Sequence, residues 1–333
     1  MQKNKNNNED KTMPGFTTHY LFGLNTYKQF DHTFLKQVIR DNHAAYSLGL
    51  QGPDVFFYFL PSYMVHHNNI GALAHVDRTG VFLKYLLDSR KIFHRRKERR
   101  IAESYIAGFL GHYTLDTYCH PYVYWKTNFK EKNGRYHGCH MSLETDIDTE
   151  LLQFYKHRLP SAFRQNATIR LTRLQFRTIA SILYYVYHKA YPELGILHLT
   201  MRTAIRSMQF GTRWLHDPSG RKKAIGSRLE TLILGYPLLT TLIPSDSLTF
   251  HIDPLNILHQ PWQNPWDNSH ISTDSFFDLM ESAQKDYLEI LSDANRLFQT
   301  QSRTDSEQVQ TKALLDKLGN KSYHSGLDCG IPS

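Results

Sequence analysis

The sequence predicts an all-α fold in which a single multi-helix domain is flanked by polar tails. Three long segments repeat their apolar residues at steps of three and four, as amphipathic helices do. Alternating apolar and polar runs, which are typical of strands, are scarce. The hydrophobic share of 41% and the charged share of 21% are ordinary for a globular chain of 333 residues. No break in composition within residues 13–298 indicates a second domain.

The expected helices follow one another along the chain. Residues 105–118 carry apolar side chains at helical steps, and residues 174–191 are apolar on most sides, which is typical of a core helix. Residues 277–298 show a third helical pattern. Ser275 and Asp278 have the spacing of a capping box, so we expect this helix to begin directly after Ser275.

Both ends of the chain are polar. Residues 1–12 lack the apolar segment of a secretory signal, so we expect a disordered extension and a cytoplasmic location. Met13 opens a more apolar segment, and we interpret it as the functional start. Residues 299–333 are rich in Ser, Gln and Lys, which predicts a loosely ordered tail. The helical domain is therefore expected to span residues 13–298.

The positive charge is concentrated in one short segment. The chain has 39 Lys and Arg against 31 Asp and Glu, a net charge of +8, and residues 90–100 alone contribute +6. Such a run can contact an anionic membrane surface, although a solvated helix face is the more frequent explanation. Phe93 is the only aromatic residue within it that could stack on bases, so a nucleic-acid partner is not favoured.

Two classes of protein are disfavoured by composition. Three cysteines cannot build a disulfide framework, which argues against a small oxidised scaffold. Residues 231–244 form the longest uncharged apolar run but contain Gly235 and Pro237. This run is shorter than the roughly 20 residues that a membrane-spanning helix needs, so no transmembrane segment is expected.

Histidines and carboxylates at helical spacing mark the candidate site. His112, Asp116 and His120 lie at positions i, i+4 and i+8, so a helix presents all three on one side. Pro121 is expected to end that helix. His140 and Glu144 repeat the i, i+4 spacing further along.

Imidazole and carboxylate groups are ligands that zinc accepts, and a rigid helix fixes their separation. A single His–Glu pair on a helix is usually a surface hydrogen bond. Two sets within 33 residues favour metal binding over a structural polar network. Cys119, next to His120, points about 100° away from it on a helix and is interpreted as a core residue.

These motifs, together with three residues upstream, resemble the bacterial zinc-dependent phospholipase C family over residues 14–148. Members of that family are all-α enzymes with a trinuclear zinc cluster in a cleft. The matching residues occur here in the family's order: His19, Asp54, His75, His112 with Asp116 and His120, and His140 with Glu144.

The resemblance implies three zinc sites. The first is held by Asp54, His75, His112 and Asp116, and the second by His120, His140 and Glu144. The third is held by His19 and by Asp116, which bridges the first and third sites. It also implies hydrolysis of a phospholipid to diacylglycerol and a phosphorylated headgroup by a zinc-activated water. Asp54 is the expected catalytic residue, because a carboxylate can touch zinc and orient or deprotonate the water. The alternative for Asp54 is a turn residue after Gly52 and Pro53.

Some assignments and the function class stay open. His66 and His67 compete with His75 for the position between Asp54 and His112. Secreted family members also hold the third zinc through an N-terminal Trp, which this chain lacks near His19; the amine of Pro14 is the nearest candidate. Besides a phosphodiester hydrolase, a zinc-dependent single-strand nuclease and a catalytically inactive metal-binding protein remain alternatives.

Overall fold

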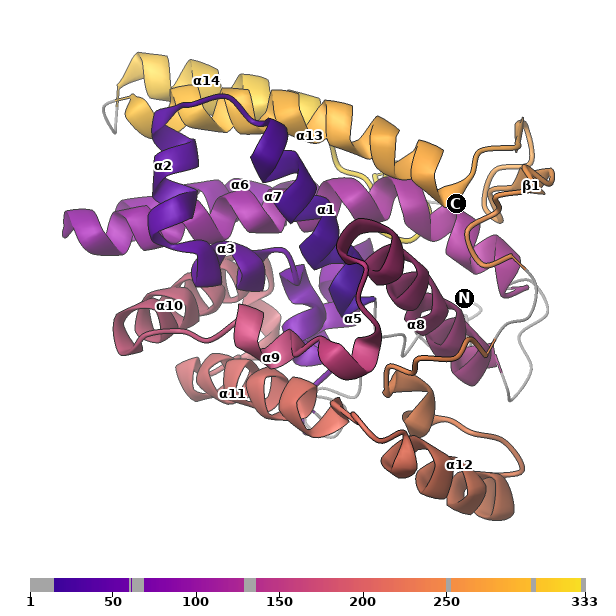
Figure 1. Cartoon of the computed structure of the whole chain (residues 1–333). Coiled ribbons are helices and arrows are strands. Elements are labelled where there is room, and N and C mark those ends of the chain that lie inside the picture. The colour runs from indigo at the N-terminus through magenta and orange to yellow at the C-terminus, as the bar shows by residue number, and fades with distance from the viewer. Residues whose placement is uncertain are drawn as a thin grey trace, which may run out of the picture.

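The computed structural model of the chain (Figure 1) describes residues 15–59, 61, 69–128, 136–249, 253–300 and 304–330. Its α-helices are α1 (Phe16–Gln29), α2 (Phe34–Asp41), α3 (His43–Gly49), α5 (Ile70–Val76), α6 (Thr79–Asp88), α7 (Arg96–Lys126), α8 (Tyr136–Lys156), α9 (Gln165–Thr168), α10 (Arg173–Ala190), α11 (His198–Leu215), α12 (Arg221–Leu234), α13 (Phe276–Gln299) and α14 (Asp305–Leu318). Short 3-10 turns occur at η1 (Gly52–Phe56), η2 (Ser89–Ile92), η4 (Pro160–Ala162), η5 (Pro192–Leu194) and η6 (Leu239–Leu242).

The prediction of an all-α fold is confirmed. In the described ranges the extended structure amounts to β1 (Trp262–Gln263) paired antiparallel with β2 (Ile271–Ser272), and a single bridge between Lys321 and Asp328. The three predicted helices are present as parts of α7, α10 and α13, and Ser275 and Asp278 form the expected capping box.

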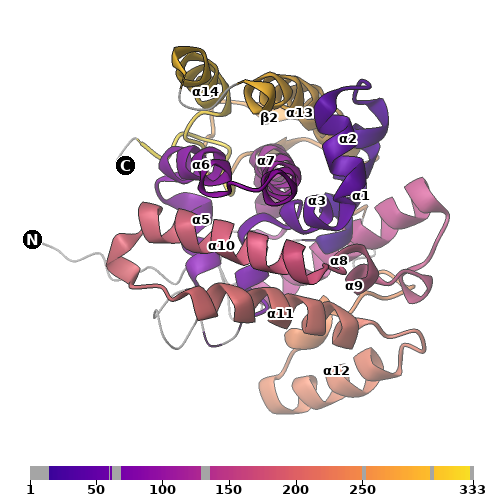
Figure 2. The same ribbon diagram turned by 90° about the vertical axis from the view of Figure 1, so that its left-hand side faces the viewer.

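Helix α7 is the axis of the fold. Figure 2 looks nearly along it and shows α3, α10 and α13 against its sides, whereas α11 and α12 lie beyond α10. Every residue in the range 101–116 is buried. A helix that is covered all round presents polar side chains to other protein groups rather than to water, and this is how α7 carries His112 and Asp116 into the interior.

Helix α7 does not end at Pro121, contrary to the prediction, and continues to Lys126. Proline has no N–H to bond the carbonyl of Thr117, four residues earlier. The turn is instead covered by the chain near Gly326, where a Cβ would lie 2.4 Å from that carbonyl oxygen and φ is +67°. Burial of the flanking Cys119, Tyr122 and Val123 outweighs the lost hydrogen bond, and the helix persists.

The expectation of a loosely ordered tail is wrong for residues 304–330. Helix α14 packs on α13 and α6, and the residues after it, 319–330, fold back over α7; we call residues 319–330 the C-terminal segment. The hydroxyl of Tyr113 donates to the carbonyl of Leu318 at 2.8 Å, and Tyr323 is fully buried. A few apolar anchors and backbone hydrogen bonds thus order a stretch whose composition is mostly polar.

The basic run at residues 90–100 is divided between two environments. Arg90 is buried, pairs with the buried Glu307 of α14 and also donates to the carbonyl of Leu297. Arg95, Arg96 and Lys97 are exposed at the start of α7. Only part of the run can therefore meet an external partner. No helix in the described ranges is long and apolar enough to cross a membrane.

Glu103 lies near the buried Arg90, and its ionisation is expected to make the stability of the protein depend on pH. Burial raises the pKa of Glu103 to about 7, although Arg90 and two neighbouring arginines lower it. A carboxyl group whose folded pKa is above its unfolded value of 4.5 stabilises the fold least when ionised, so stability falls as pH rises through 4.5–7. Glutamine mimics the protonated form of the side chain. We therefore expect the free energy of unfolding of Glu103→Gln to fall by about 3 kcal/mol less than that of the wild type over this pH range. Urea unfolding of both proteins at pH 5 and pH 8 checks it; the same pH dependence in both would contradict it.

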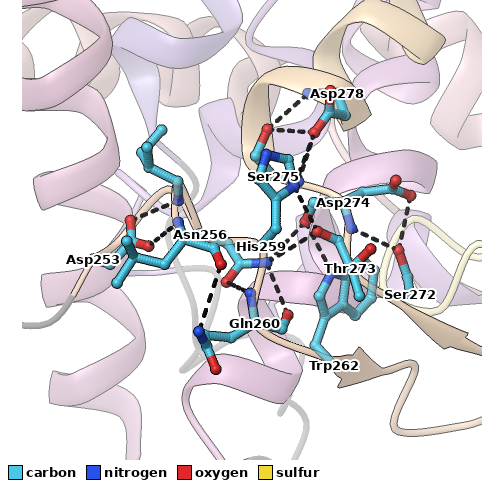
Figure 3. A network of polar contacts seen from close by, with 12 residues as sticks. Asp253, Asn256, His259, Gln260, Trp262, Ser272, Thr273, Asp274, Ser275 and Asp278 are labelled. Carbon is cyan, nitrogen blue, oxygen red and sulfur yellow. Dashed lines mark hydrogen bonds and ion pairs between the residues drawn. The ribbon is translucent and has the colours of Figure 1, made fainter.

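The stretch of residues 253–275 is a loop that contains the short strands β1 and β2. Figure 3 shows its polar network: the Asp253 carboxylate accepts the backbone N–H groups of Ile257 and Leu258, and the Asn256 amide donates to the carbonyl of Asp274 at 3.1 Å. The indole N–H of Trp262 also donates to that carbonyl. Asn264 extends from the loop to the carbonyl of Ser325 at 2.8 Å, so the loop supports the C-terminal segment.

Candidate metal centre

All eight predicted ligand side chains are brought together in one buried cluster. They come from α1, η1, α5, α7 and α8, and none is more than 7% exposed. Segments that lie more than 100 residues apart in the sequence therefore place ionisable groups in the same small volume. The members are His19, Asp54, His75, His112, Asp116, His120, His140 and Glu144.

Asp116 is the hub of the cluster, with a different pair of histidines at each oxygen. Its Oδ1 lies 3.2 Å from Nε2 of His19 and 3.6 Å from Nε2 of His120. Its Oδ2 lies 3.0 Å from Nε2 of His112 and 3.8 Å from Nε2 of His75. A carboxylate with this arrangement has the geometry to bridge two cations.

The remaining two carboxylates complete two further groupings. Asp54 lies 3.2 Å from Nε2 of His75 through Oδ1, and its Oδ2 lies 3.7 Å from Nδ1 of His112. Oε1 of Glu144 lies 3.6 Å from Nε2 of His120 and 3.3 Å from Nε2 of His140. Two groups of three side chains have ligand atoms close enough together for one metal ion: His19, Asp54 and His112, and His75, His112 and Asp116.

Backbone carbonyls fix the orientation of three imidazole rings. Nδ1 of His75 lies 2.7 Å from the carbonyl of Gly71, and Nδ1 of His112 lies 3.2 Å from that of Leu50. Nδ1 of His120 lies 3.1 Å from the carbonyl of Tyr323. A carbonyl only accepts hydrogen bonds, so each Nδ1 carries the proton and each Nε2 is left to face the carboxylates. Outer-shell hydrogen bonds of this kind orient metal-binding histidines.

The facing atoms of this centre are mostly acceptors. Burial lowers the pKa of His112 to about 3, despite the neighbouring Asp116, so its Nε2 is an unprotonated lone pair at neutral pH. That lone pair lies 3.0 Å from a carboxylate oxygen. Six buried atoms of the cluster lack a hydrogen-bond partner among the described residues: Nδ1 of His19, both oxygens of Asp54, Nε2 of His112, Oδ2 of Asp116 and Oε2 of Glu144. Bound cations would be coordinated by these lone pairs and carboxylate oxygens, so the residues fit zinc.

The pKa shifts of the carboxylates separate their environments. Burial and the nearby Asp116 raise the pKa of Asp54 well above its usual range. Burial also raises the pKa of Glu144 to about 7, against the opposing effect of His120. The pKa of Asp116 is held well below its usual range, because the surrounding histidines outweigh burial. Asp116 is therefore the carboxylate that stays ionised most readily.

Local sequence explains how Asp54 and His19 reach the centre. A Cβ at Gly52 would lie 2.2 Å from the ring of His112, and its φ is +48°, so glycine allows η1 to approach α7 and deliver Asp54. Asp148 of α8 accepts the backbone N–H groups of Thr17 and Thr18 at 2.9 and 2.7 Å. This contact fixes the first turn of α1, which carries His19.

The hollow against these groups is small. It has a volume of about 20 Å³ and is lined in part by His19, Asp116, Cys119, His120 and Glu144. This is room for a water molecule or a small ion, whereas the sequence led us to expect a cleft that admits a substrate. Cys119 is buried in the core, as its position on the helix predicted.

His324 is a member of the site that sequence reasoning missed. It belongs to the C-terminal segment and is only 9% exposed. Its ring centre lies 5.5 Å from that of His75, 6.1 Å from that of His120 and 5.1 Å from that of Tyr124. Two imidazoles that share one zinc at 2.0–2.1 Å have ring centres about 5 Å apart. His324 is therefore placed where it could supply a further ligand.

Replacing His324 with alanine tests this placement. We expect His324→Ala to weaken zinc affinity by about 10-fold or more, because a donor beside His75 and His120 is removed. Competition with a chromogenic chelator measures the affinity. The matched control is His270→Ala, since His270 is exposed on the loop of residues 253–275. Equal affinities in both variants would show that His324 only fills space.

Several other candidates lie outside the described residues or away from the centre. His66, His67, Met13 and Pro14 are not among the described residues, and the cluster includes His75 at the position for which the first two compete. Four aromatic residues, at positions 56–59, follow shortly after Asp54 in the sequence. Phe56, the first of them, is fully buried and belongs to the core.

Comparison of the chain with protein-family models, with curated proteins and with solved structures found no match. The function of the chain is therefore inferred from the geometry of its candidate metal centre.

Proposed function

We propose that the protein is a zinc-dependent phosphodiester hydrolase that cleaves a phospholipid in the manner of a phospholipase C. The observation that carries the proposal is the convergence of eight His, Asp and Glu side chains on one buried cluster in which acceptor atoms face one another. Asp116, the carboxylate that stays ionised most readily, repels an anionic phosphodiester unless cations are present. Zinc ions, when bound, offset this charge and lower the pKa of a water molecule.

The chain's own residues supply the remaining requirements. Asp54, Asp116 and Glu144 would hold the metal together with the histidines named above. Asp54 would also orient the attacking water and accept its proton, since neither of its oxygens accepts a hydrogen bond from another described residue. The carbonyls of Gly71, Leu50 and Tyr323 would keep the imidazoles in position throughout.

A substrate panel tests the proposal. The purified protein, reconstituted with zinc, is incubated with phosphatidylcholine vesicles, with a soluble aryl phosphodiester and with a single-stranded oligonucleotide. We expect diacylglycerol and phosphorylated headgroup from the lipid. Faster cleavage of the oligonucleotide would favour the nuclease alternative, and bound zinc without turnover of any substrate would favour a metal-binding protein.

A further inference from the structure

Helix α12 carries an apolar stripe on the side that faces away from the rest of the protein. Ile225, Leu229 and Leu232 recur at i, i+4 and i+7 and therefore share one face of the helix. They are 60%, 55% and 83% exposed, and the adjacent Ile233 is 77% exposed. No residue of α12 is buried. Such a helix presents its apolar side to the outside.

Small and polar residues make the contacts between α12 and the rest of the protein. A Cβ at Gly226 would lie 2.6 Å from the side chain of Thr240 in η6, so this face of the helix is the one that touches the protein. The carboxylate of Glu230 accepts the backbone N–H groups of Leu238 and Leu239 at 2.7 and 3.1 Å. The orientation of α12 is thus fixed by specific contacts, and the outward direction of its stripe is a built feature of the fold.

The surroundings of the stripe are strongly basic. Residues 197–242 contain seven Lys and Arg and two acidic residues, a net charge of +5. The two acids are engaged locally: Glu230 as described, and Asp217 by the N–H of Lys223 at 2.9 Å. Arg221, Lys222 and Arg228 lie on α12 beside the stripe and are exposed.

Helix α11 adds exposed aromatic residues next to α12. Phe210 is 70% and Trp214 is 57% exposed, at i and i+4 on one face. Lys222 of α12 donates to the carbonyl of Trp214 at 2.9 Å, so the two exposed surfaces adjoin. Figure 1 shows both helices at the lower edge of the molecule. We call the exposed side chains of α11 and α12 together the α11–α12 face.

We propose that the α11–α12 face docks the protein on the surface of an anionic lipid bilayer. An amphipathic helix with aliphatic residues on one side, flanked by Lys and Arg and joined by Trp and Phe, has the composition of helices that lie in the membrane interface. A second copy of the chain is a poorer occupant, because residues 197–242 of each copy carry a net charge of +5 and repel each other. Nucleic acid would leave the aliphatic stripe without a role.

This face is connected to the candidate metal centre. Helix α12 rests on η6, and the hydroxyl of Thr145 on α8 donates to the carbonyl of Thr241 in η6 at 2.9 Å. Thr145 directly follows Glu144. Docking on a bilayer does not require hydrolysis. If the protein is the phospholipid hydrolase proposed above, the bilayer surface is where it meets its substrate, and this last step rests on the proposed function.

Vesicle sedimentation tests the inference with the full chain. Vesicles of phosphatidylcholine with an equal amount of phosphatidylglycerol are compared with phosphatidylcholine alone, at low and high salt. We expect binding to the anionic vesicles to weaken about 10-fold in L232Q/I233Q and to a similar extent in R221Q/R228Q. The apolar control is V309Q/L258Q, two residues 68% and 70% exposed elsewhere. The charge control is R96Q/K97Q, from the exposed part of the other basic run.

Each outcome decides the inference. Normal binding by both control proteins, with loss in both α12 variants, supports it. Loss in R96Q/K97Q with normal binding of the α12 variants would place the contact at residues 90–100 and overturn it. A wild-type dimer that becomes a monomer in L232Q/I233Q, measured by light scattering, would instead identify a face between two copies. Lipid turnover is assayed separately in the same samples, so absence of hydrolysis and absence of docking are distinguished.

Discussion

Asp116→Asn is expected to abolish hydrolysis and to strip most of the bound metal. Asp116 contacts four histidines, two through each oxygen, and it is the carboxylate whose pKa is held lowest. Asparagine keeps the size of the side chain but removes the charge that offsets two cations, so turnover is expected to fall about 10³-fold or more. Metal content by mass spectrometry and activity on the same preparation measure both effects.

The matched control is His188→Ala. His188 is exposed on α10, and its ring stacks on that of Tyr184 with 5.4 Å between the ring centres. It is not one of the residues of the candidate metal centre. We expect this variant to retain both metal and activity. Circular dichroism of both variants reports on folding, and equal losses in the two would show that general damage rather than loss of the bridge is responsible.

Removal of metal is expected to lower the stability of the whole protein. Without cations, the neutral His112 and the ionised Asp116 leave acceptor atoms facing each other at 3.0 Å inside the core. Metal that binds only the native state at 1,000 times its dissociation constant contributes about 4 kcal/mol. We therefore expect treatment with a strong chelator to lower the free energy of unfolding by an amount on this order.

Thermal and urea unfolding, before and after chelation, measure the loss. Addition of zinc should restore stability, whereas magnesium should not, because a site rich in imidazole suits zinc better than magnesium. A protein that is purified without zinc and does not respond to the chelator would contradict the metal interpretation as well as the function proposed from it.

Local spacing in the sequence predicts only part of the cluster. On one helix, i, i+4 spacing places His112 beside Asp116 and His140 beside Glu144 by geometry alone. The positions of His19, Asp54 and His75 were expected only from the order of a family motif, since no local pattern links them to α7. The structure brings all of these side chains together, while the metal itself stays a prediction.

The features that sequence reasoning missed depend on contacts between distant residues. Pro121 was expected to end its helix, but burial and the chain at Gly326 maintain the turn. His324 has no carboxylate at helical spacing and lies in a polar stretch, so composition alone predicted a loose tail. Leu232 and Ile233 of the α12 stripe lie in the apolar run of residues 231–244, but only the fold adds Ile225 and Leu229 to them and shows that Gly226 and Glu230 hold the helix against the protein.

The folding back of the C-terminal segment has a consequence for biosynthesis. His19 and His324 are separated by about 300 residues, and the carbonyl that orients His120 belongs to Tyr323. At a translation rate of about 5–20 residues per second, the ribosome reaches the codon for His324 roughly 15–60 s after that for His19. Until then the centre lacks the carbonyl of Tyr323 and the imidazole of His324, both of which lie against His120 in the folded protein. The centre is therefore completed only after Tyr323 and His324 have been synthesised, and capture of metal is expected to be a late step of folding.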